Sequence, residues 1–328
     1  MKHDVAGLGN ALVDALVRLP DDRLLSELEL ERGHMHPRPH DEWVEIFERA
    51  RHHGVEIQSG GSCANTIATL GLMGLGARFC GQVADDAFGA LYRGSVEEAC
   101  GGHALQLSGA GNTGKCLSLI SARDAERTMV TDLGCAVELS DLGDFEGIIE
   151  ACRVLHVTGY LFLGGPMVQA AQRAMRFAKD HRVPVSLDVA DPFVIDAVRG
   201  RMDAAIDEAD IVFLNEEEAR AVTGLGPEEA IVELAARAST VIVKMGRRGS
   251  LVAQDGQIAK VQVYETTAVD TTGAGDSFAA GYLYGWCKGW EPGRSGDLGS
   301  RVAALAVAQM GAVVRDRDAL AAAVAAVA

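Results

Sequence analysis

Apolar residues follow different patterns in the two halves of the chain. From about residue 150 onward, short apolar, β-branched runs alternate with segments that have the period of amphipathic helices; the runs are residues 154–158, 183–188, 211–215 and 241–245. Each run is apolar throughout rather than at every second position, which is typical of central strands covered by helices on both faces. The second half therefore predicts βαβ units and a doubly wound, parallel sheet.

The first 140 residues contain segments in which apolar and polar positions alternate, namely 4–19, 104–107, 115–122 and 128–133. A period of two predicts strands with one buried face, and short turns between them indicate a small antiparallel sheet beside the main one. Residues 21–54, 62–71 and 88–99 have helical patterns. No repeat or linker divides the chain, so we expect residues 1–328 to form one domain, with the small sheet built from segments within about 10–60 and 104–134.

Composition and charge narrow the class of protein. The chain has 328 residues, of which 48% are hydrophobic and 23% charged, a balance that excludes a disordered, collagen-like or coiled-coil protein. The net charge is −16, so no general electrostatic field attracts nucleic acid or an anionic membrane. We therefore expect neither as a partner.

Cysteine usage and the first residues indicate a compartment. The seven cysteines form no C-x-x-C pair, and their odd number and wide spacing favour reduced thiols. Asp4 and Asn10 interrupt the stretch where a signal peptide needs an apolar core, and no run of 18 apolar residues occurs. We expect a cytoplasmic protein.

Two segments carry partial matches to ligand-binding motifs, but their context favours loops. Residues 109–115 match G-x-G-x-x-G and nearly match the Walker A pattern, which would suggest a dinucleotide or nucleotide site. Both motifs require a following helix, whereas residues 115–122 alternate like a strand, so the glycines predict a hairpin turn. His34, His36 and His40 lack the spacing of a metal-binding helix face and predict an exposed loop.

The stretch 270–283, DTTGAGDSFAAGYL, is the most informative for chemistry, because a glycine-rich turn leads directly into a helical pattern. Gly273 and Gly275 allow the N–H groups of residues 273–276 to converge where a helix N-terminus favours an anion such as phosphate. Asp276 would repel that anion. Two roles fit it: a helix cap, or a base that accepts the proton of an attacking hydroxyl while the turn stabilises transferring charge.

Asn215 and Glu218 form a second polar feature, immediately after the apolar run 211–214. Acidic residues in a first helical turn complement the helix dipole, which is one sufficient explanation. The alternative is that Asn215 and Glu218, one turn apart on one face, lie near a hydrated Mg²⁺ at nucleotide phosphates.

A third polar feature lies near the N-terminus. Asn10 and Asp14 are four residues apart in a predicted strand, which puts them on one face among apolar neighbours, where sugar hydroxyls would be suitable partners. Gly60, Gly61 and Asn65 at the next strand-to-helix turn would add a platform for close approach. The alternative is an edge-strand Asp and a helix-start Asn with no ligand.

In this order, these segments resemble the PfkB, or ribokinase-like, family of carbohydrate kinases; the carrying motifs are GGSCANT, NEEE, VKMGRRGS and DTTGAGDSFAAG. The resemblance implies a three-layer α/β sandwich with a mainly parallel central sheet and a small antiparallel β lid. It implies ATP and Mg²⁺, and in some subfamilies K⁺. It also implies a role for eight residues: Asp276 as the base; the amides of Gly273, Ala274 and Gly275 as the anion site; Asn215 and Glu218 near Mg²⁺, through water; and Lys244 and Gly246 by the nucleotide. Asp270 is implied as a monovalent-cation candidate.

Within this family, the chain is most similar to the adenosine kinase branch. Ribokinases commonly have Lys where this chain has Ser62, whereas GNALVDALVRL, the helical insertion before residue 60 and AERTMVTDLGCA resemble adenosine kinases. This similarity implies that Asn10, Asp14, Gly61 and Asn65 contact ribose hydroxyls and that Arg127 approaches the transferring phosphate. Asp132 departs from the branch, which often has Asn there. Tyr160 and Phe162 are candidates to contact a purine, and packing in the core explains them equally well.

The expected reaction is transfer of the γ-phosphoryl group of ATP to a primary hydroxyl of a ribofuranosyl substrate, with adenosine first. The alternatives are another nucleoside or a free sugar such as ribose, fructose or 2-keto-3-deoxygluconate. A protein that binds a sugar or nucleoside without catalysis is a further alternative. The expected partner is a small molecule, and the protein is expected to be a monomer or homodimer.

Overall fold

An eight-stranded sheet organises most of the chain in the computed structural model, which describes residues 3–124 and 126–327. In sheet order from one edge, its strands are β15 (Gln257–Val261), β14 (Ser250–Gln254), β13 (Thr240–Lys244), β12 (Ile211–Asn215), β11 (Val185–Asp188), β10 (Val154–Thr158), β1 (Val5–Leu8) and β5 (Ala77–Cys80). The pairings from β5 to β13 are all parallel, and β14 and β15 extend the edge as an antiparallel hairpin. The expected mainly parallel sheet is confirmed.

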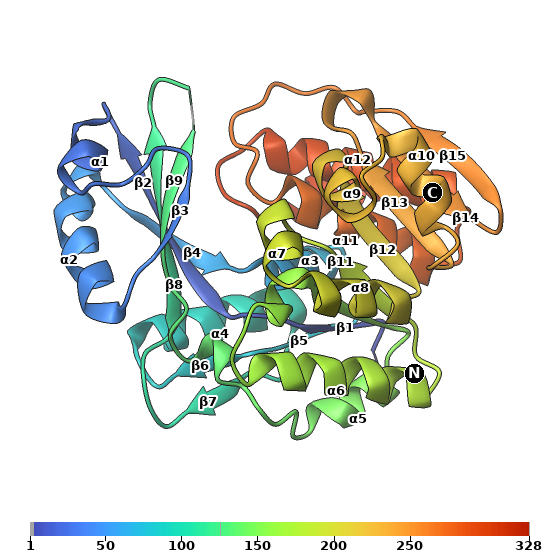
Figure 1. Ribbon diagram of the computed structural model, residues 1–328, viewed down its shortest axis with the longest axis horizontal. Helices are drawn as coiled ribbons and strands as arrows, with labels where there is room; N and C mark the ends of the chain where they lie inside the picture. The colour runs from blue at the N-terminus through green and yellow to red at the C-terminus, as the bar shows by residue number, and fades with distance from the viewer. Residues whose placement is uncertain (1–2, 125, 328) are drawn as a thin grey trace.

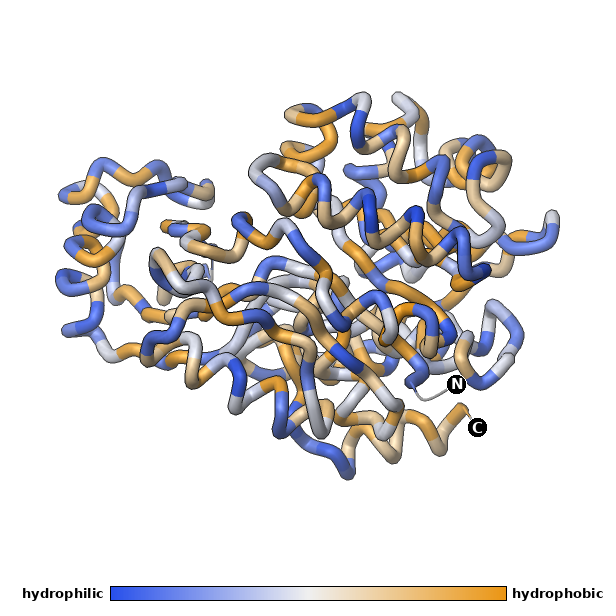
Figure 2. Tube along the Cα trace, turned by 90° about the horizontal axis from the view of Figure 1, so that it is seen from below, coloured by the Kyte–Doolittle hydropathy of each residue, from blue (hydrophilic) through white to orange (hydrophobic). Residues whose placement is uncertain are grey.

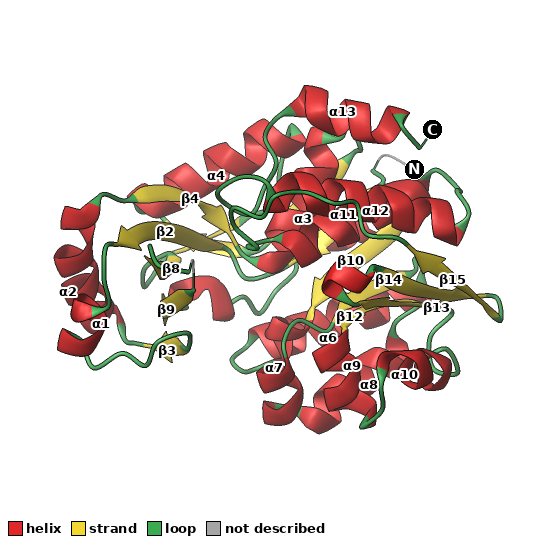
Figure 3. Ribbon diagram, turned by 90° about the horizontal axis from the view of Figure 1, so that it is seen from above, coloured by secondary structure: helices red, strands yellow, loops and turns green. Residues whose placement is uncertain are grey.

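Helices cover both faces of this sheet (Figure 3). One face carries α3 (Ser62–Leu72), α4 (Ala87–Cys100), α11 (Ala274–Cys287), α12 (Pro292–Val307) and α13 (Arg317–Ala325). The other carries α5 (Phe145–Glu150), α6 (Met167–Asp180), α7 (Pro192–Ala197), α8 (Arg199–Glu208), α9 (Glu216–Thr223) and α10 (Pro227–Leu234). The fold is the three-layer α/β sandwich expected from the sequence.

The unbroken apolar runs are explained by these two layers. Along β10, Val154 packs into the core on the α3 and α11 side, whereas Leu155 and Val157 pack into the core on the α6 side. A strand covered on both faces is mostly apolar, and the buried polar exception in β10, His156, is paired through Nδ1 with Ser186 Oγ at 3.0 Å. Figure 2 shows helical turns that alternate between hydrophobic and hydrophilic positions, as expected for helices with one face on a core.

A separate five-stranded sheet, called the small sheet below, lies beside the carboxyl edge of the main sheet (Figure 1). In order, its strands are β3 (Met35–Pro37), β9 (Arg127–Asp132), β8 (Gly114–Ser121), β2 (Leu12–Leu19) and β4 (Glu56–Gly60). Its pairing is mixed: β2–β4 and β8–β9 are antiparallel, while β2–β8 and β3–β9 are parallel. Its outer face packs against α1 (Arg23–Glu27) and α2 (His40–Ala50).

Several local expectations differ from the structure. The alternating segment 4–19 forms two strands in different sheets, because the chain leaves β1 at Gly9 and enters the small sheet at Leu12. Residues 104–107 contribute β7 (Gln106–Ser108), which pairs with β6 (Gln82–Ala84) in a two-stranded sheet rather than with the small sheet. The glycines at 109–114 therefore connect two different sheets and do not form a hairpin turn.

Short 3-10 helices complete the fold: η1 (Arg51–His53), η2 (Gly134–Val137), η3 (Gly159–Phe162) and η4 (Gly246–Arg248). Among the described residues, no helix is both long and apolar enough to cross a bilayer.

Candidate active site

Polar side chains end three neighbouring strands of the main sheet at the edge that faces the small sheet. Asp188 ends β11, Asn215 ends β12 and Lys244 ends β13, and Asn215 is the register partner of Lys244. The carboxyl edge of an open parallel sheet is where ligands bind in α/β folds. The parallel order of β11, β12 and β13 thus brings these polar groups together at one edge of the sheet.

The turn before α11 meets the same edge. Gly273 has φ +71° and is the N-cap of α11, and a Cβ there would lie 2.5 Å from the carbonyl oxygen of Ala312, so only glycine fits. The first hydrogen bond of α11 runs from the N–H of Ser277 to Gly273 O at 2.8 Å. The N–H groups of Gly275 and Asp276 precede this bond and have no acceptor within the helix. Donors in this arrangement are suited to bind an anion.

Asp276 lies in the first turn of α11, and its carboxylate is held by two side chains of α3. Ser62 Oγ donates to Oδ1 at 2.7 Å, and Asn65 Nδ2 donates to Oδ2 at 2.8 Å. Burial raises the pKa of Asp276 to about 6, and the two hydrogen bonds limit that rise by favouring the charged form. The carboxylate is not the cap of its own helix, because that position belongs to Gly273.

Asp14 and the paired glycines form the second side of the site. A Cβ at Gly60 would lie 2.1 Å from Asp14 Oδ2, and a Cβ at Gly61, where φ is +93°, would lie 2.4 Å from the carbonyl oxygen of Asn10. Both positions therefore require glycine. Asn10 lies in the loop between β1 and β2, not on a strand as expected, and its Oδ1 atom is buried without a hydrogen-bond partner. An unpartnered buried acceptor suits a donor hydroxyl of a ligand.

The inner face of the small sheet is directed at Asp276. Asp14, Cys116 and Thr131 are register partners across β2, β8 and β9, and Arg127 lies on the same face, four residues before Thr131 in β9. Burial raises the pKa of Asp14 to about 7; the guanidinium of Arg127 opposes this rise and the carboxylate of Asp276 adds to it. These influences link the small sheet electrostatically to α11.

Arg127 and Asp270 shape the turn that carries the anion site. Arg127 Nη1 donates to Thr272 Oγ1. Asp270 Oδ1 accepts from the N–H and hydroxyl of Thr272, and Oδ2 accepts from Gly311 N–H at 3.1 Å. Burial raises the pKa of Asp270, but these donors more than offset it, so the pKa lies below its ordinary value. Asp270 therefore braces the turn.

Asn215 and Glu218 form a capping box at the start of α9. Asn215 Oδ1 accepts from Glu218 N–H at 2.8 Å, and Glu218 Oε2 accepts from Asn215 N–H at 2.7 Å. Glu218 is 3% exposed, and burial raises its pKa to about 7. The helix-capping explanation of this motif is therefore sufficient for its geometry. Gly246, in η4 just beyond β13, is exposed at the same edge.

Two residues that contact the site, Ser62 and Asp188, were not selected from the sequence. Ser62 entered only as a departure from ribokinases, yet it bonds the Asp276 carboxylate. Asp188 was read as the end of an apolar run, yet its Oδ2 accepts from Lys244 Nζ at 2.9 Å. The signal for Asp188 was a carboxylate at a strand end; the contact of Ser62, 214 residues from its partner, left no local signal.

The two aromatic residues considered as purine contacts, Phe162 and Tyr160, lie in different surroundings. Phe162 is 1% exposed in the core on the α6 side, so packing explains it. Tyr160 is half-buried and close enough to Asp276 for that carboxylate to help raise the pKa of the Tyr160 hydroxyl, after the larger effect of burial.

His40 begins α2 rather than lying in an exposed loop, and its Nδ1 is 3.2 Å from Asp132 Oδ2. Asp132 also pairs with the buried Lys115 at 2.6 Å.

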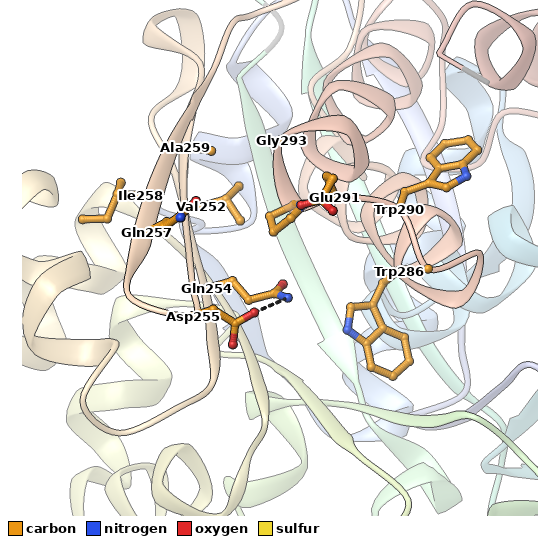
Figure 4. Close-up of a pocket in the computed structure, with 12 residues that line it drawn as sticks. Val252, Gln254, Asp255, Gln257, Ile258, Ala259, Trp286, Trp290, Glu291 and Gly293 are labelled. Atoms are coloured by element: carbon orange, nitrogen blue, oxygen red, sulfur yellow. Dashed lines mark hydrogen bonds between the residues drawn. The ribbon is translucent and has the colours of Figure 1, made fainter.

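A cavity of about 550 Å³ lies elsewhere, between the β14–β15 hairpin and the junction of α11 and α12 (Figure 4). Trp286 and Trp290 line it together with Gln254, Asp255 and Glu291, and none of the candidate site residues does. Trp286 is ten residues beyond Asp276 along α11, which is roughly 15 Å along the helix axis. The cavity is thus separate from the candidate site.

No group of three or more His, Cys, Asp or Glu side chains gathers to hold a metal ion within residues 3–124 and 126–327. The oxygens of Glu218 are buried and engaged with Asn215. This donor set fits a hydrated Mg²⁺ contacted through water better than one ligated directly.

Comparison with known proteins identifies relatives. The family model "pfkB family carbohydrate kinase" matches residues 42–318. Adenosine kinase of Saccharomyces cerevisiae is 28% identical over 278 residues, covering 78% of this chain and 79% of that protein. The 5-dehydro-2-deoxygluconokinase of Bacillus subtilis is 26% identical over 263 residues, covering 76% of this chain and 81% of that protein.

Among solved structures, the adenosine kinase of Sinorhizobium meliloti aligns with a TM-score of 0.90 and 28% identity, covering 100% of both chains. The fold, the similarity to adenosine kinases and the length of the family match all indicate the same family. The chain belongs to the pfkB family of carbohydrate kinases, enzymes that transfer a phosphoryl group to a hydroxyl group.

Proposed function

We propose that this protein transfers the γ-phosphoryl group of ATP to the primary hydroxyl of a ribofuranosyl substrate, and that adenosine is its acceptor. The observation that carries the proposal is the carboxylate of Asp276, which is fixed by Ser62 and Asn65 beside the N–H donors that begin α11. A base and an anion site in contact are the two groups that phosphoryl transfer to a hydroxyl requires.

In the proposed reaction, Asp276 accepts the proton of the acceptor hydroxyl as its oxygen bonds to the γ-phosphorus. The bond from that phosphorus to the bridging oxygen breaks, and ADP leaves. The N–H groups of Gly275 and Asp276, with Ala274 and Gly273 shaping the turn, stabilise the charge on the transferring group, and Arg127 approaches it from the small sheet. Mg²⁺, when bound with ATP, neutralises part of the phosphate charge.

The acceptor lies between Asp276 and the small sheet in this proposal. Asp14, Asn10, Asn65, Gly60 and Gly61 bind its ribose hydroxyls, one of which supplies the donor that Asn10 Oδ1 lacks. The small sheet acts as a lid that excludes water, which would otherwise compete as an acceptor.

One observation favours a nucleoside over a free sugar. Met35 and Met129 are register partners across β3 and β9, on the face of the small sheet that carries Arg127, and Met35 is 45% exposed. Flexible apolar thioethers suit the flat, apolar surface of a purine base, whereas a free sugar presents hydroxyls. The similarity to adenosine kinases points the same way.

The nucleotide is proposed to lie along the ends of β12 and β13, near Asn215, Lys244 and Gly246, with Glu218 near Mg²⁺ through water. Asp270 is proposed to contribute to a K⁺ site, and both of its carboxylate oxygens already accept hydrogen bonds from the chain. Measuring turnover with K⁺ replaced by Na⁺ tests it.

The test of the function is ADP release with Mg-ATP and a panel of adenosine, inosine, cytidine, ribose, fructose, 2-keto-3-deoxygluconate and 5-dehydro-2-deoxygluconate. We expect selective turnover of adenosine that is lost in Asp276→Asn. Turnover of a free sugar alone would favour the second candidate, a sugar kinase, which the similarity to 5-dehydro-2-deoxygluconokinases supports. Ligand binding without ADP release would identify a non-catalytic binder.

A further inference from the structure

The carboxylate of Asp188 and the ammonium of Lys244 form a partly enclosed pair across the end of the main sheet. Asp188 ends β11 and Lys244 ends β13, so the two side chains meet over the end of the intervening β12. Their side chains are 7% and 16% exposed, and Lys244 Nζ donates to Asp188 Oδ2 at 2.9 Å. A pair removed from water in this way costs solvation, so its retention calls for a reason beyond stability.

The Asp188 carboxylate is fixed in orientation from both sides. Its Oδ1 accepts from Ala190 N–H at 3.1 Å, while Oδ2 accepts from Lys244. The chain turns sharply at Ala190, a non-glycine residue with φ +85°. Rotation of the carboxylate would break one of these two bonds, so the ammonium is held at a defined place.

That place is beside the anion site. A Cβ built on Gly275 would lie 3.1 Å from Lys244 Nζ, so the ammonium approaches the first turn of α11 closely. An ammonium has three N–H donors, and among the described residues only Asp188 is recorded as its acceptor. The remaining donors are available to an anion bound at the N-terminus of α11.

The charge of Lys244 depends on its neighbours. The titratable groups that face it are Asp188 from β11, Glu218 from α9, Asp276 from α11 and His156 from β10. Burial lowers the pKa of Lys244, but the carboxylates, Asp188 foremost, more than offset this and the net shift is upward. Burial also lowers the pKa of His156 to about 4, so this imidazole is neutral near pH 7.

We propose that Asp188 is a positioning residue for phosphoryl transfer, which holds the Lys244 ammonium beside the anion site so that it contacts the oxygens of the transferring phosphoryl group. Lys244 keeps its proton throughout; it stabilises charge, while Asp276 receives the proton of the acceptor. This inference rests on the proposed function and adds to it a residue that acts through another.

The test is the pH dependence of turnover with Mg-ATP and adenosine for Asp188→Asn, Lys244→Met and the double variant. Asp188→Asn should lower kcat by roughly tenfold to a hundredfold and introduce an alkaline loss of activity at lower pH than in the unchanged protein, because the buried ammonium then loses its proton more readily. In the Lys244→Met background, Asp188→Asn should cause no further loss.

Matched controls separate this role from a structural one. Asp203→Asn, on α8, removes a partner of Arg237 at the surface and should leave the pH profile unchanged. Thermal unfolding shows whether Asp188→Asn is folded, and Lys244→Gln provides a second variant without the ammonium. An unmoved alkaline limb, or equal losses from Asp188→Asn with and without Lys244, would overturn the inference. In that case, turnover that still depends on Asp276 would leave the proposed function intact.

Discussion

Removing the hydroxyl of Ser62 should change the protonation of Asp276, the proposed base, without altering the shape of the site. Ser62 Oγ donates to Asp276 Oδ1 at 2.7 Å, and this bond favours the charged form of a half-buried carboxylate whose pKa is about 6. Ser62→Ala leaves Asn65 as the remaining side-chain donor to the carboxylate. We expect the pKa of Asp276 to rise.

The size of the rise follows from the strength of such a bond. A hydrogen bond to a charged group contributes about 1.5–3 kcal/mol, and one pKa unit corresponds to about 1.4 kcal/mol, so the pKa should increase by roughly one to two units. The ionised fraction of Asp276 at pH 7 then falls from about nine-tenths to between about a half and a tenth. Turnover at pH 7 should fall roughly twofold to tenfold, and it should recover near pH 9.

The assay is kcat/KM for adenosine from pH 5 to 9.5. Ser62→Thr, which keeps a hydroxyl, should retain the profile of the unchanged protein. Ser95→Ala removes a hydroxyl that bonds Ser59 and Arg315 and does not contact Asp276, so it is the matched control. If the acid limb of Ser62→Ala coincides with that of the unchanged protein, the assignment of Asp276 as the titrating base is wrong.

Three further predictions concern the small sheet. Gly60→Ala should raise the KM for adenosine roughly tenfold to a hundredfold and leave the KM for ATP nearly unchanged, because a methyl group would displace the Asp14 carboxylate; equal effects on both substrates would contradict this placement. Asp132→Asn should lower the free energy of unfolding in urea by about 3 kcal/mol, because it leaves the buried Lys115 ammonium uncompensated; a loss below about 1 kcal/mol would show that the pair is solvated. Without ligand, the protein should lose thermal stability as pH rises from about 4 to 7, because Asp14, Asp276 and Glu218 bind their protons more tightly when folded, with pKa values of about 7, 6 and 7; Asp14→Asn should remove the part of this slope that Asp14 causes, and an unchanged slope would refute that contribution.

The sequence predicted those parts of the fold whose signals are local. Residues 154–158 form β10 as expected, because a strand covered on both faces is mostly apolar. The β14–β15 hairpin was missed although Asp255-Gly256 between two alternating runs is a strong turn signal. Strand β3 has three residues and ends at Pro37, which gives too short a pattern to detect.

The sequence predicted those parts of the site whose geometry is determined by a short motif alone. The glycine turn at 273–276 appears at a helix N-terminus as the sequence indicated. The contacts made by Ser62 and Asp188 depend on how α3 packs against α11 and on the order of β11, β12 and β13, and neither is encoded in a short segment. Asn10 was placed on a strand because alternation continues through residues 9–11, where the chain crosses between sheets.

The small sheet has a hydrophobic core of its own. Leu119 and Val130 from its strands pack with Trp43 and Ile46 from α2, in a cluster distinct from those on either side of the main sheet. The chain passes between the two sheets at a few short connections that include Gly9, Gly61 and Gly134. A tilt of the small sheet would therefore leave its interior packing intact and concentrate backbone rotation at those connections. Asp14 and Arg127 would travel together, so both side chains would approach Asp276 in one rigid movement rather than by separate rearrangements.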